Sequence, residues 1–376
     1  MIRVLGMALM MLSLTAPAAS ADPVRLSLPA PTGEHRVGTT FLHLVDAGRV
    51  DTLAPTPRPR EVMVRLWYPA APSHRPRAPY MTPAHARELA GQLNALAGTD
   101  YPDDLLAFPT HSRLDAPADG THHPIVVLSH GLGTNAAQHT GQAEELASRG
   151  YVVAAIDHTY DAVAVEFPGG RLELANPDVP STDERLLSTR VADLSFVLDK
   201  LTDLAAGHNP DAEHRRLPAG IGRALDPNRV AAMGHSMGSR TVVRAMVADH
   251  RIDAAVVMDG APFGNPGPID RPVLMLGNQH HHRAEIPDWA DFYDRLLGPR
   301  LHIVVDGVEH LDLTDITVFK KTIDMSFFGP GPIDGERSLF IQRRYITAWL
   351  DYALRDRHSP LLNGESPRFP EVDFQP

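Results

Sequence analysis

One serine lies where a short apolar run gives way to a run of helical pattern. Ser236 stands in the stretch GHSMG, which fits the pattern Gly-x-Ser-x-Gly. At a junction between a strand and a helix, the flanking glycines permit a tight turn that lifts the serine hydroxyl out of the sheet. Such a hydroxyl becomes a nucleophile when a histidine removes its proton and a carboxylate orients that histidine. The pattern predicts a nucleophile at Ser236, rather than a serine that merely caps a helix.

His310 is the candidate base. In a serine hydrolase that carries the Gly-x-Ser-x-Gly turn, the chain order is serine, acid and then histidine. The chain has 20 histidines, so position has to decide among them. His310 follows RLHIVVDG (300–307), the last apolar run of strand type, whereas His302 lies inside that run and His130 and His158 precede the serine.

The acid is less sharply defined by the sequence. Asp259 lies directly at the end of the apolar run IDAAVVMDG, the first such run after the nucleophile. We prefer it to Glu285 and Asp288, which lie in a polar segment beyond the next run. An aspartate at a strand end is also typical of a turn or a helix cap, so spacing alone leaves this alternative open.

The run His280-His281-His282 follows another apolar segment. We interpret it as a solvated loop, with a metal site as the minority alternative. The chemistry described above requires no metal and no organic cofactor, and we expect none.

The elements that must position these residues are short buried strands that alternate with helical segments. Such alternation predicts an α/β fold with a mostly parallel sheet that helices cover on both faces. Functional side chains of such sheets collect just after the carboxyl ends of the strands. The predicted strands include PIVVLSHG (124–131), YVVAAIDH (151–158), RVAAMGHS (229–236), IDAAVVMDG (252–260), RPVLMLGNQ (271–279) and RLHIVVDG (300–307).

Composition limits the function classes. The formal net charge is −11, with 35 basic and 46 acidic residues and no basic stripe, which argues against nucleic acid as a partner. There is no cysteine, and therefore neither a disulfide nor a thiol nucleophile. Residues 1–21 read as a signal peptide, with a positive start, an apolar stretch and a cleavage site after Ala21. We therefore expect a secreted or periplasmic protein without a transmembrane span, which leaves transient contact with a lipid surface possible.

The sequence predicts one domain over residues 22–376. The segment 77–115 lies between two predicted strands and is interpreted as a lid or cap insertion over the site. Residues 363–376 are polar and rich in proline, and we expect an irregular tail there. Neither the oligomeric state nor any movement of the lid follows from the sequence.

Several of these stretches together resemble a known family. LSHGLG, YVVAAIDH, RVAAMGHSMG, AAVVMDGAPFG and GVEHLDLTD are similar to segments of the plasma-type platelet-activating factor acetylhydrolases and their bacterial relatives. The resemblance spans roughly residues 37–354 and implies the α/β-hydrolase fold. It implies Ser236 as nucleophile, Asp259 as acid and His310 as base. It also implies an oxyanion hole made by the backbone N–H groups of Leu132 and Met237.

One position departs from the family pattern, because Ser239 stands where a second glycine is usual. The resemblance implies a secreted serine esterase or lipase that acts on short-acyl or oxidised phospholipids or on other small esters. An acyltransferase or a peptidase on the same scaffold is the alternative, and a catalytically inactive binding protein is a more distant one. The sequence does not define acyl length or head group.

Overall fold

The computed structural model describes residues 24–182, 184–260 and 265–375. The predicted signal peptide, residues 1–21, lies outside this part of the chain. In the described ranges there is no helix with the length and apolar character needed to cross a membrane.

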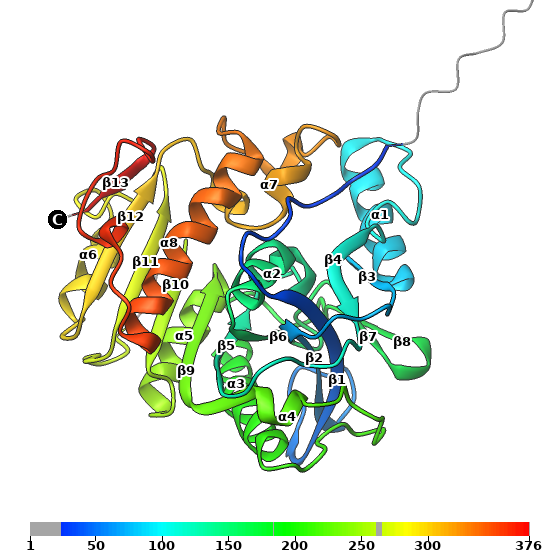
Figure 1. Ribbon diagram of the computed structural model, residues 1–376. Helices are drawn as coiled ribbons and strands as arrows, with labels where there is room; N and C mark the ends of the chain where they lie inside the picture. The colour runs from blue at the N-terminus through cyan, green and yellow to red at the C-terminus, as the bar shows by residue number, and fades with distance from the viewer. Residues whose placement is uncertain (1–23, 183, 261–264, 376) are drawn as a thin grey trace, which may run out of the picture.

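The core of the molecule is an eleven-stranded sheet with the order β13-β12-β11-β10-β9-β5-β6-β2-β1-β4-β3 (Figure 1). The six strands from β6 to β12 in this order are all parallel. A separate two-stranded ribbon is made by β7 and β8. The strands are β1 (Arg36–Val50), β2 (Pro59–Ala70), β3 (Arg77–Pro79), β4 (Pro109–Leu114), β5 (His123–Ser129), β6 (Val152–Asp157), β7 (Ala164–Phe167), β8 (Arg171–Leu174), β9 (Leu225–His235), β10 (Ala254–Met258), β11 (Val273–Asn278), β12 (Arg300–Val305) and β13 (Val372–Phe374).

Helices cover both faces of the sheet. One apolar cluster joins α3, α5 and α6 to one face, and a second joins α2 and α8 to the other (Figure 1). The α-helices are α1 (Pro83–Ala97), α2 (Thr140–Ser148), α3 (Glu184–Ala205), α4 (Ile221–Ala224), α5 (Met237–Ala248), α6 (Pro287–Asp294), α7 (Ile316–Phe319) and α8 (Gly335–Arg355). The 3₁₀ helices are η1 (Ala136–His139), η2 (Pro168–Gly170), η3 (His310–Leu313), η4 (Ser326–Phe328) and η5 (Pro360–Leu362).

The central strands read as unbroken apolar runs because both of their faces are buried. In β10 all five residues, Ala254 to Met258, are buried. Side chains of a strand point alternately to opposite faces, so Val257 joins the cluster with α3 and α5, whereas Val256 and Met258 join the cluster with α2 and α8. The predicted parallel sheet with helices on both faces is confirmed.

The tail differs from its prediction. Residues 372–374 form β13, which pairs antiparallel with β12, and Phe369 and Val372 are buried. Residues 363–376 are therefore not wholly irregular, because the edge of β12 offers unpaired backbone groups that the returning chain can satisfy.

The segment 77–115 contributes two short strands and one helix. Strand β4 pairs with β1, and β3 pairs with β4, so this segment forms the edge of the sheet opposite β13. Helix α1 lies between them in sequence and packs in a third apolar cluster together with residues of α7.

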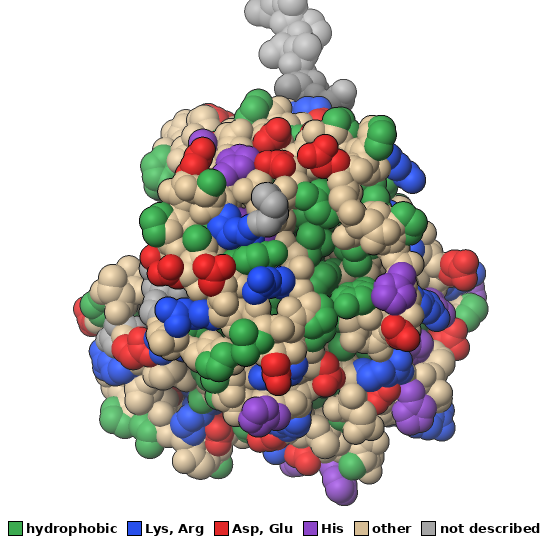
Figure 2. All heavy atoms as spheres, turned by 90° about the vertical axis from the view of Figure 1, so that its left-hand side faces the viewer, with side chains coloured by type: hydrophobic (Ala, Val, Ile, Leu, Met, Phe, Trp, Pro, Cys, Tyr) green, Lys and Arg blue, Asp and Glu red, His purple; other side chains and the backbone are tan. Residues whose placement is uncertain are grey.

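The charged side chains are mixed in sign on the face drawn in Figure 2, where red and blue groups alternate around a band of hydrophobic side chains right of centre. This distribution accords with the formal net charge of −11, which the sequence spreads over many separate acidic positions.

Candidate active site

Ser236 occupies the turn between β9 and α5. Its backbone has φ 55° and ψ −117°, a conformation that a side chain-bearing residue rarely adopts. A residue held in such a region costs about 1–3 kcal/mol and persists only where the surrounding structure enforces it. The strain marks Ser236 as the tip of a sharp turn.

The glycines around the serine are required by close backbone approach. A Cβ on Gly234 would overlap the carbonyl of Gly238, and a Cβ on Gly238 would overlap the carbonyl of Ser129 in β5. Gly260 is packed equally tightly, since a Cβ there would overlap the carbonyl of Ser236 itself. The first two are the glycines of the pattern Gly-x-Ser-x-Gly, so the motif is a packing requirement of the turn.

Ser239, which departs from the family pattern, is accommodated with its hydroxyl satisfied. It is fully buried, and its Oγ donates to the carbonyl of Gly234 at 2.8 Å and lies 2.9 Å from the carbonyl of Met258. The hydroxyl therefore ties the first turn of α5 to the ends of β9 and β10. The hydroxyl of Ser239 thus adds hydrogen bonding to the turn at Ser236, which a glycine at position 239 could not provide.

The structure brings Asp259 and His310 together. Asp259 follows β10 and His310 begins η3 after β12, and Nδ1 of His310 lies 2.5 Å from Oδ2 of Asp259. Asn278, the last residue of β11, fixes the same carboxylate from the strand between them. Its backbone N–H donates to Oδ1 at 2.9 Å, and its side-chain amide donates to Oδ2 at 3.0 Å.

The carboxyl group of Asp259 is buried and ionised. Burial alone would raise the pKa of Asp259, but hydrogen bonds from His281 and His310 and the charges of these imidazoles hold it well below its usual range. A carboxylate in this state accepts hydrogen bonds and does not donate one, so the proton it faces stays on Nδ1 of His310. The arrangement leaves Nε2 of His310 without that proton and able to act as a base.

His310 also lies beside the residue that precedes the serine. Nε2 of His235 is 2.9 Å from the backbone oxygen of His310, and the two imidazole rings are 4.6 Å apart between centroids. Among the described residues no hydrogen bond joins Ser236 Oγ to His310, whose side chain is 46% exposed. Catalytic hydrogen bonds are often loose before a substrate is bound.

The loop after β5 faces the serine. A Cβ on Gly131 would lie 3.4 Å from the Cβ of Ser236. The carbonyl of Gly131 belongs to the same planar peptide as the N–H of Leu132, and it accepts from the Thr134 hydroxyl at 2.9 Å and from the buried guanidinium of Arg190 at 3.3 Å. These donors fix the direction of the Leu132 N–H. Met237 is the first residue of α5, where N–H groups have no partner inside the helix.

Arg190 is held in place by its own partner. It is fully buried and forms an ion pair with Asp161, with Nε 2.5 Å from Oδ2, and it also donates to the carbonyl of His130 at 2.5 Å. The buried charge is thus compensated beneath the loop. Sequence reasoning missed Arg190, which lies within an ordinary helical pattern of α3.

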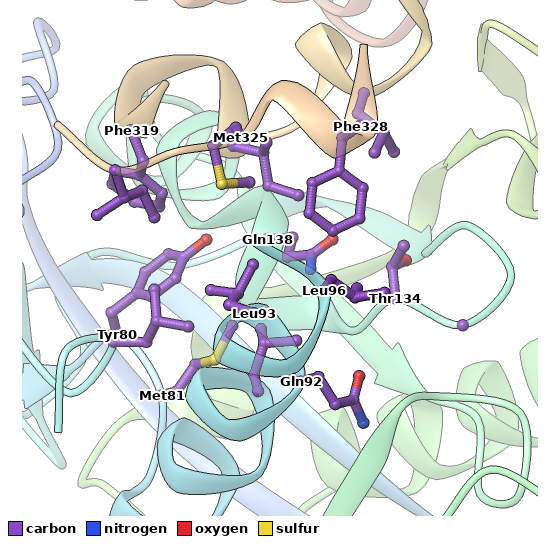
Figure 3. Close-up of a pocket in the computed structure, with 16 residues that line it drawn as sticks. Tyr80, Met81, Gln92, Leu93, Leu96, Thr134, Gln138, Phe319, Met325 and Phe328 are labelled. Carbon is purple, nitrogen blue, oxygen red and sulfur yellow. The ribbon is translucent and has the colours of Figure 1, made fainter. Parts of the chain in front are cut away.

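An apolar pocket borders the site (Figure 3). Gly133 and Thr134, just after Leu132, and Leu311, next to His310, belong to its wall. Counting its solvent-open mouth, it contains about 680 Å³ of empty space. Figure 3 shows side chains of the segment 319–328 facing those of α1 and of Tyr80 and Met81, which follow β3, across it. The lining residues are Tyr80, Met81, Leu89, Gln92, Leu93, Leu96, Leu106, Gly133, Thr134, Gln138, Leu311, Ile316, Phe319, Ile323, Met325 and Phe328.

The alternative acids lie elsewhere. Glu285 and Asp288 are exposed residues before and at the start of α6, whereas the carboxylate of Asp259 is the one bonded to His310.

The three histidines of the run point to three different partners. His280 contacts Glu309, His281 contacts Asp259, and His282 contacts Gln375. The described residues contain no group of three or more side chains arranged to hold a metal ion. The interpretation of the run as a solvated loop is wrong for His281, whose ring packs at 4.8 Å against Trp289. The position of His281 three residues past the end of β11 was the signal available in the sequence.

Comparison with known proteins places the chain in a family. The family model described as platelet-activating factor acetylhydrolase, isoform II, matches residues 21–167 and 178–361, most of the chain. The chain belongs to this family. A probable 1-alkyl-2-acetylglycerophosphocholine esterase of Arthroderma benhamiae is 28% identical to this member over 95% of each chain. The platelet-activating factor acetylhydrolase of Cavia porcellus is 25% identical, over 80% of this chain and 76% of its own.

A solved structure agrees with this membership. The ferulic acid esterase of Streptomyces cinnamoneus superposes with a TM-score of 0.80 at 34% identity, covering 93% of this chain and 99% of its own. This member of the acetylhydrolase family therefore has the α/β-hydrolase fold and is a carboxylic ester hydrolase.

Proposed function

We propose that Ser236, His310 and Asp259 form the catalytic triad and that hydrolysis runs through an acyl-enzyme. His310 Nε2 takes the hydroxyl proton as Ser236 Oγ attacks the ester carbonyl carbon. The bond to the alcohol oxygen then breaks, and His310 gives its proton to that oxygen. His310 then takes a proton from a water molecule, which attacks the acyl carbon. The bond between that carbon and Ser236 Oγ breaks, and His310 returns the proton to Oγ as the acid is released.

The negative charge on the carbonyl oxygen needs donors that are already in place. We assign this role to the backbone N–H groups of Leu132 and Met237. The bonds that hold the Gly131 carbonyl support the first assignment, and the free first turn of α5 supports the second. Fixed donors of this kind stabilise the transition state without reorganisation during the reaction.

The observation that carries the proposal is the hydrogen bond of 2.5 Å between His310 and Asp259, at the same edge of the sheet as the strained turn of Ser236. The three residues follow β9, β10 and β12, so they lie at the carboxyl ends of parallel strands.

The pocket is the proposed binding site for the apolar part of the substrate. None of its lining residues is charged, so it suits a short acyl chain or an uncharged ring and not a phosphocholine head group. We favour small or short-acyl esters, including short-acyl or oxidised phospholipids whose head group stays outside. The relative named for the ester 1-alkyl-2-acetylglycerophosphocholine supports this class.

A second candidate is the ester of an aromatic acid. Tyr80 and Phe319, which both line the pocket, meet edge to face with their ring centroids 5.5 Å apart, so aromatic side chains form part of its wall. The structural neighbour named ferulic acid esterase supports this alternative.

One assay series separates these substrates. Purified protein would be given p-nitrophenyl esters of increasing acyl length, a short-acyl phospholipid and methyl ferulate. We expect the highest kcat/KM among the short-acyl esters, with a decline once the chain outgrows the pocket. A preference for methyl ferulate over all of these would favour the aromatic candidate. Transfer of the acyl group to an added alcohol, in place of hydrolysis by water, would identify an acyltransferase.

We further propose that the segment 77–115 covers the site as a lid and that the protein is exported. Four residues of α1 contribute to the pocket wall, which supports the first point: Leu89, Gln92, Leu93 and Leu96. Export predicts a mature chain that begins at Asp22, which N-terminal sequencing of the secreted protein would test. A mature chain that begins at Met1 would contradict it.

A further inference from the structure

His281 contacts the carboxylate that orients the catalytic base. Its Nδ1 is hydrogen-bonded to Oδ1 of Asp259, while Nδ1 of His310 is bonded to Oδ2 of the same group. One buried carboxylate thus faces two imidazoles, one on each oxygen. The triad as described above uses His310 alone, so the second imidazole has no role assigned to it.

The ring of His281 is held in a fixed orientation. It stacks on the buried ring of Trp289 in α6, and Trp289 stacks in turn on His302 of β12 at 4.9 Å. Burial lowers the pKa of His302 to about 3, so the far end of this stack carries no charge near neutral pH. The stack leaves His281 only a quarter exposed and aims Nδ1 at Asp259.

The loop is shaped to admit this ring. A Cβ on Gly277 would lie 2.9 Å from the Cβ of His281, so the absence of a side chain at Gly277 makes room for the histidine. Asn278 fixes the turn from the other side, because its side-chain oxygen accepts the N–H of His280 at 2.8 Å while its amide donates to Asp259. The same residues therefore position both the carboxylate and His281.

We infer that His281 is a positioning residue for catalysis, which holds the Asp259 carboxylate ionised and in one orientation by donating a second imidazole hydrogen bond to it. This inference rests on the proposed triad. Because the carboxylate can only accept, the proton between the two groups belongs to Nδ1 of His281. That proton stays on His281 throughout, and His310 alone exchanges a proton with Ser236.

The donor affects the base through Asp259. A hydrogen bond to Oδ1 withdraws charge from the carboxylate, so removing it strengthens the attraction between Asp259 and the protonated form of His310. The acid limb of the kcat/KM profile, which reports the ionisation of the free enzyme's essential groups, is therefore expected to move to higher pH in the variant. The titratable and charged groups around His281 are Asp259, His310, His302, His282 and Arg283.

The test compares His281→Phe with His281→Asn. Phenylalanine keeps a ring to stack on Trp289 but cannot donate, whereas asparagine carries an amide nitrogen at the place of Nδ1. We expect His281→Phe to lower kcat on the order of 10-fold, as loss of a hydrogen bond to a charged group would, with KM little changed and the acid limb at higher pH. His281→Asn should recover most of the rate and the wild-type profile.

The matched control is His282→Phe, because His282 lies in the same loop and contacts Gln375 instead of Asp259. It should leave kcat and the pH profile unchanged. Proton NMR supplies a readout apart from activity, since two Nδ1 protons bonded to one carboxylate give two signals at low field. His281→Phe should remove one signal and retain the other.

Wild-type kcat and an unmoved acid limb in His281→Phe would overturn the inference, as would a single low-field signal in the wild type. Asp259→Asn, measured beside these variants, separates this failure from failure of the triad. If Asp259→Asn is inactive and His281→Phe matches the wild type, the inference alone is wrong. If Asp259→Asn is fully active, both the triad and the inference are wrong.

Discussion

Gly238, two residues after the proposed nucleophile Ser236, lies directly against the backbone carbonyl of Ser129 in the neighbouring strand β5. A methyl group at Gly238 has no space, so Gly238→Ala must push α5 away from the sheet. Forcing extra atoms into a packed interior typically costs about 1–3 kcal/mol, and here the obstacle is backbone that cannot rotate aside. We expect a loss of at least about 2 kcal/mol in the free energy of unfolding, together with most of the esterase activity.

Gly91→Ala is the control for this change. Gly91 lies within α1 with nothing near the place of its Cβ, and alanine favours a helix over glycine by about 0.5–1 kcal/mol. Urea unfolding should show an unchanged or higher stability for Gly91→Ala. Equal stabilities for Gly238→Ala and Gly91→Ala would show that the turn between β9 and α5 is not packed against β5 as described.

The assignment of Asp259 as the acid of the proposed triad is tested by Asp259→Asn. The amide keeps the shape of the side chain but places a donor against donors from Asn278, His281 and His310. In a serine protease the equivalent change cost about 10⁴ in kcat, and we expect a loss of that order with some loss of stability. Glu285→Gln and Asp288→Asn should be close to neutral. A large loss in either of these two, with an active Asp259→Asn, would reassign the acid.

A buried carboxyl beside the pocket sets part of the pH dependence of stability. Burial raises the pKa of Asp315 to about 8, whereas an aspartate in the unfolded chain titrates near ~3.9. Between these values the folded state keeps a proton that the unfolded state has lost, so stability falls as the pH rises, by up to about 1.4 kcal/mol per pH unit. Asp157, whose pKa burial raises to about 7, contributes with the same sign.

Asp315→Asn removes this contribution and can still accept the N–H of Gly141. We expect the variant to lose less stability than the wild type between pH 5 and pH 8, as measured by urea unfolding at both values. A wild type whose stability rises over this interval relative to the variant would contradict the assignment of a neutral Asp315.

The pocket is tested by Leu96→Trp. Leu96 lines the pocket from α1 and is 47% exposed, so a larger side chain can be carried there without disturbing the core. We expect KM to rise for esters with longer or aromatic acyl groups and to change little for an acetyl ester. Leu297→Trp, at an exposed position outside the pocket lining, should affect neither. A uniform effect of Leu96→Trp on all esters would place the acyl group elsewhere.

The sequence predicts those features that local chemistry decides. The tight turn at Ser236 needs glycines at fixed offsets, and the unbroken apolar runs indicate strands that are buried on both faces. Asp259 was preferred as the acid because it lies directly at the end of a predicted strand. An aspartate in an ordinary turn would look identical in the sequence.

What the sequence did not predict depends on distant partners. His281 is fixed by stacking on Trp289, and Arg190 acts on a loop about 60 residues earlier in the chain. Strand β13 forms only because β12 presents a free edge. No local pattern encodes these contacts, since each exists only once the sheet has brought separate segments together.

The central claim is that Ser236 is the nucleophile, and covalent labelling with a fluorophosphonate tests it most directly. Peptide mass spectrometry of the labelled protein should place the adduct on Ser236 alone. Ser236→Ala should take up no label and should lose kcat by about 10⁶, because the members of a triad act as a unit. An adduct on another serine, or substantial esterase activity in Ser236→Ala, would contradict the account.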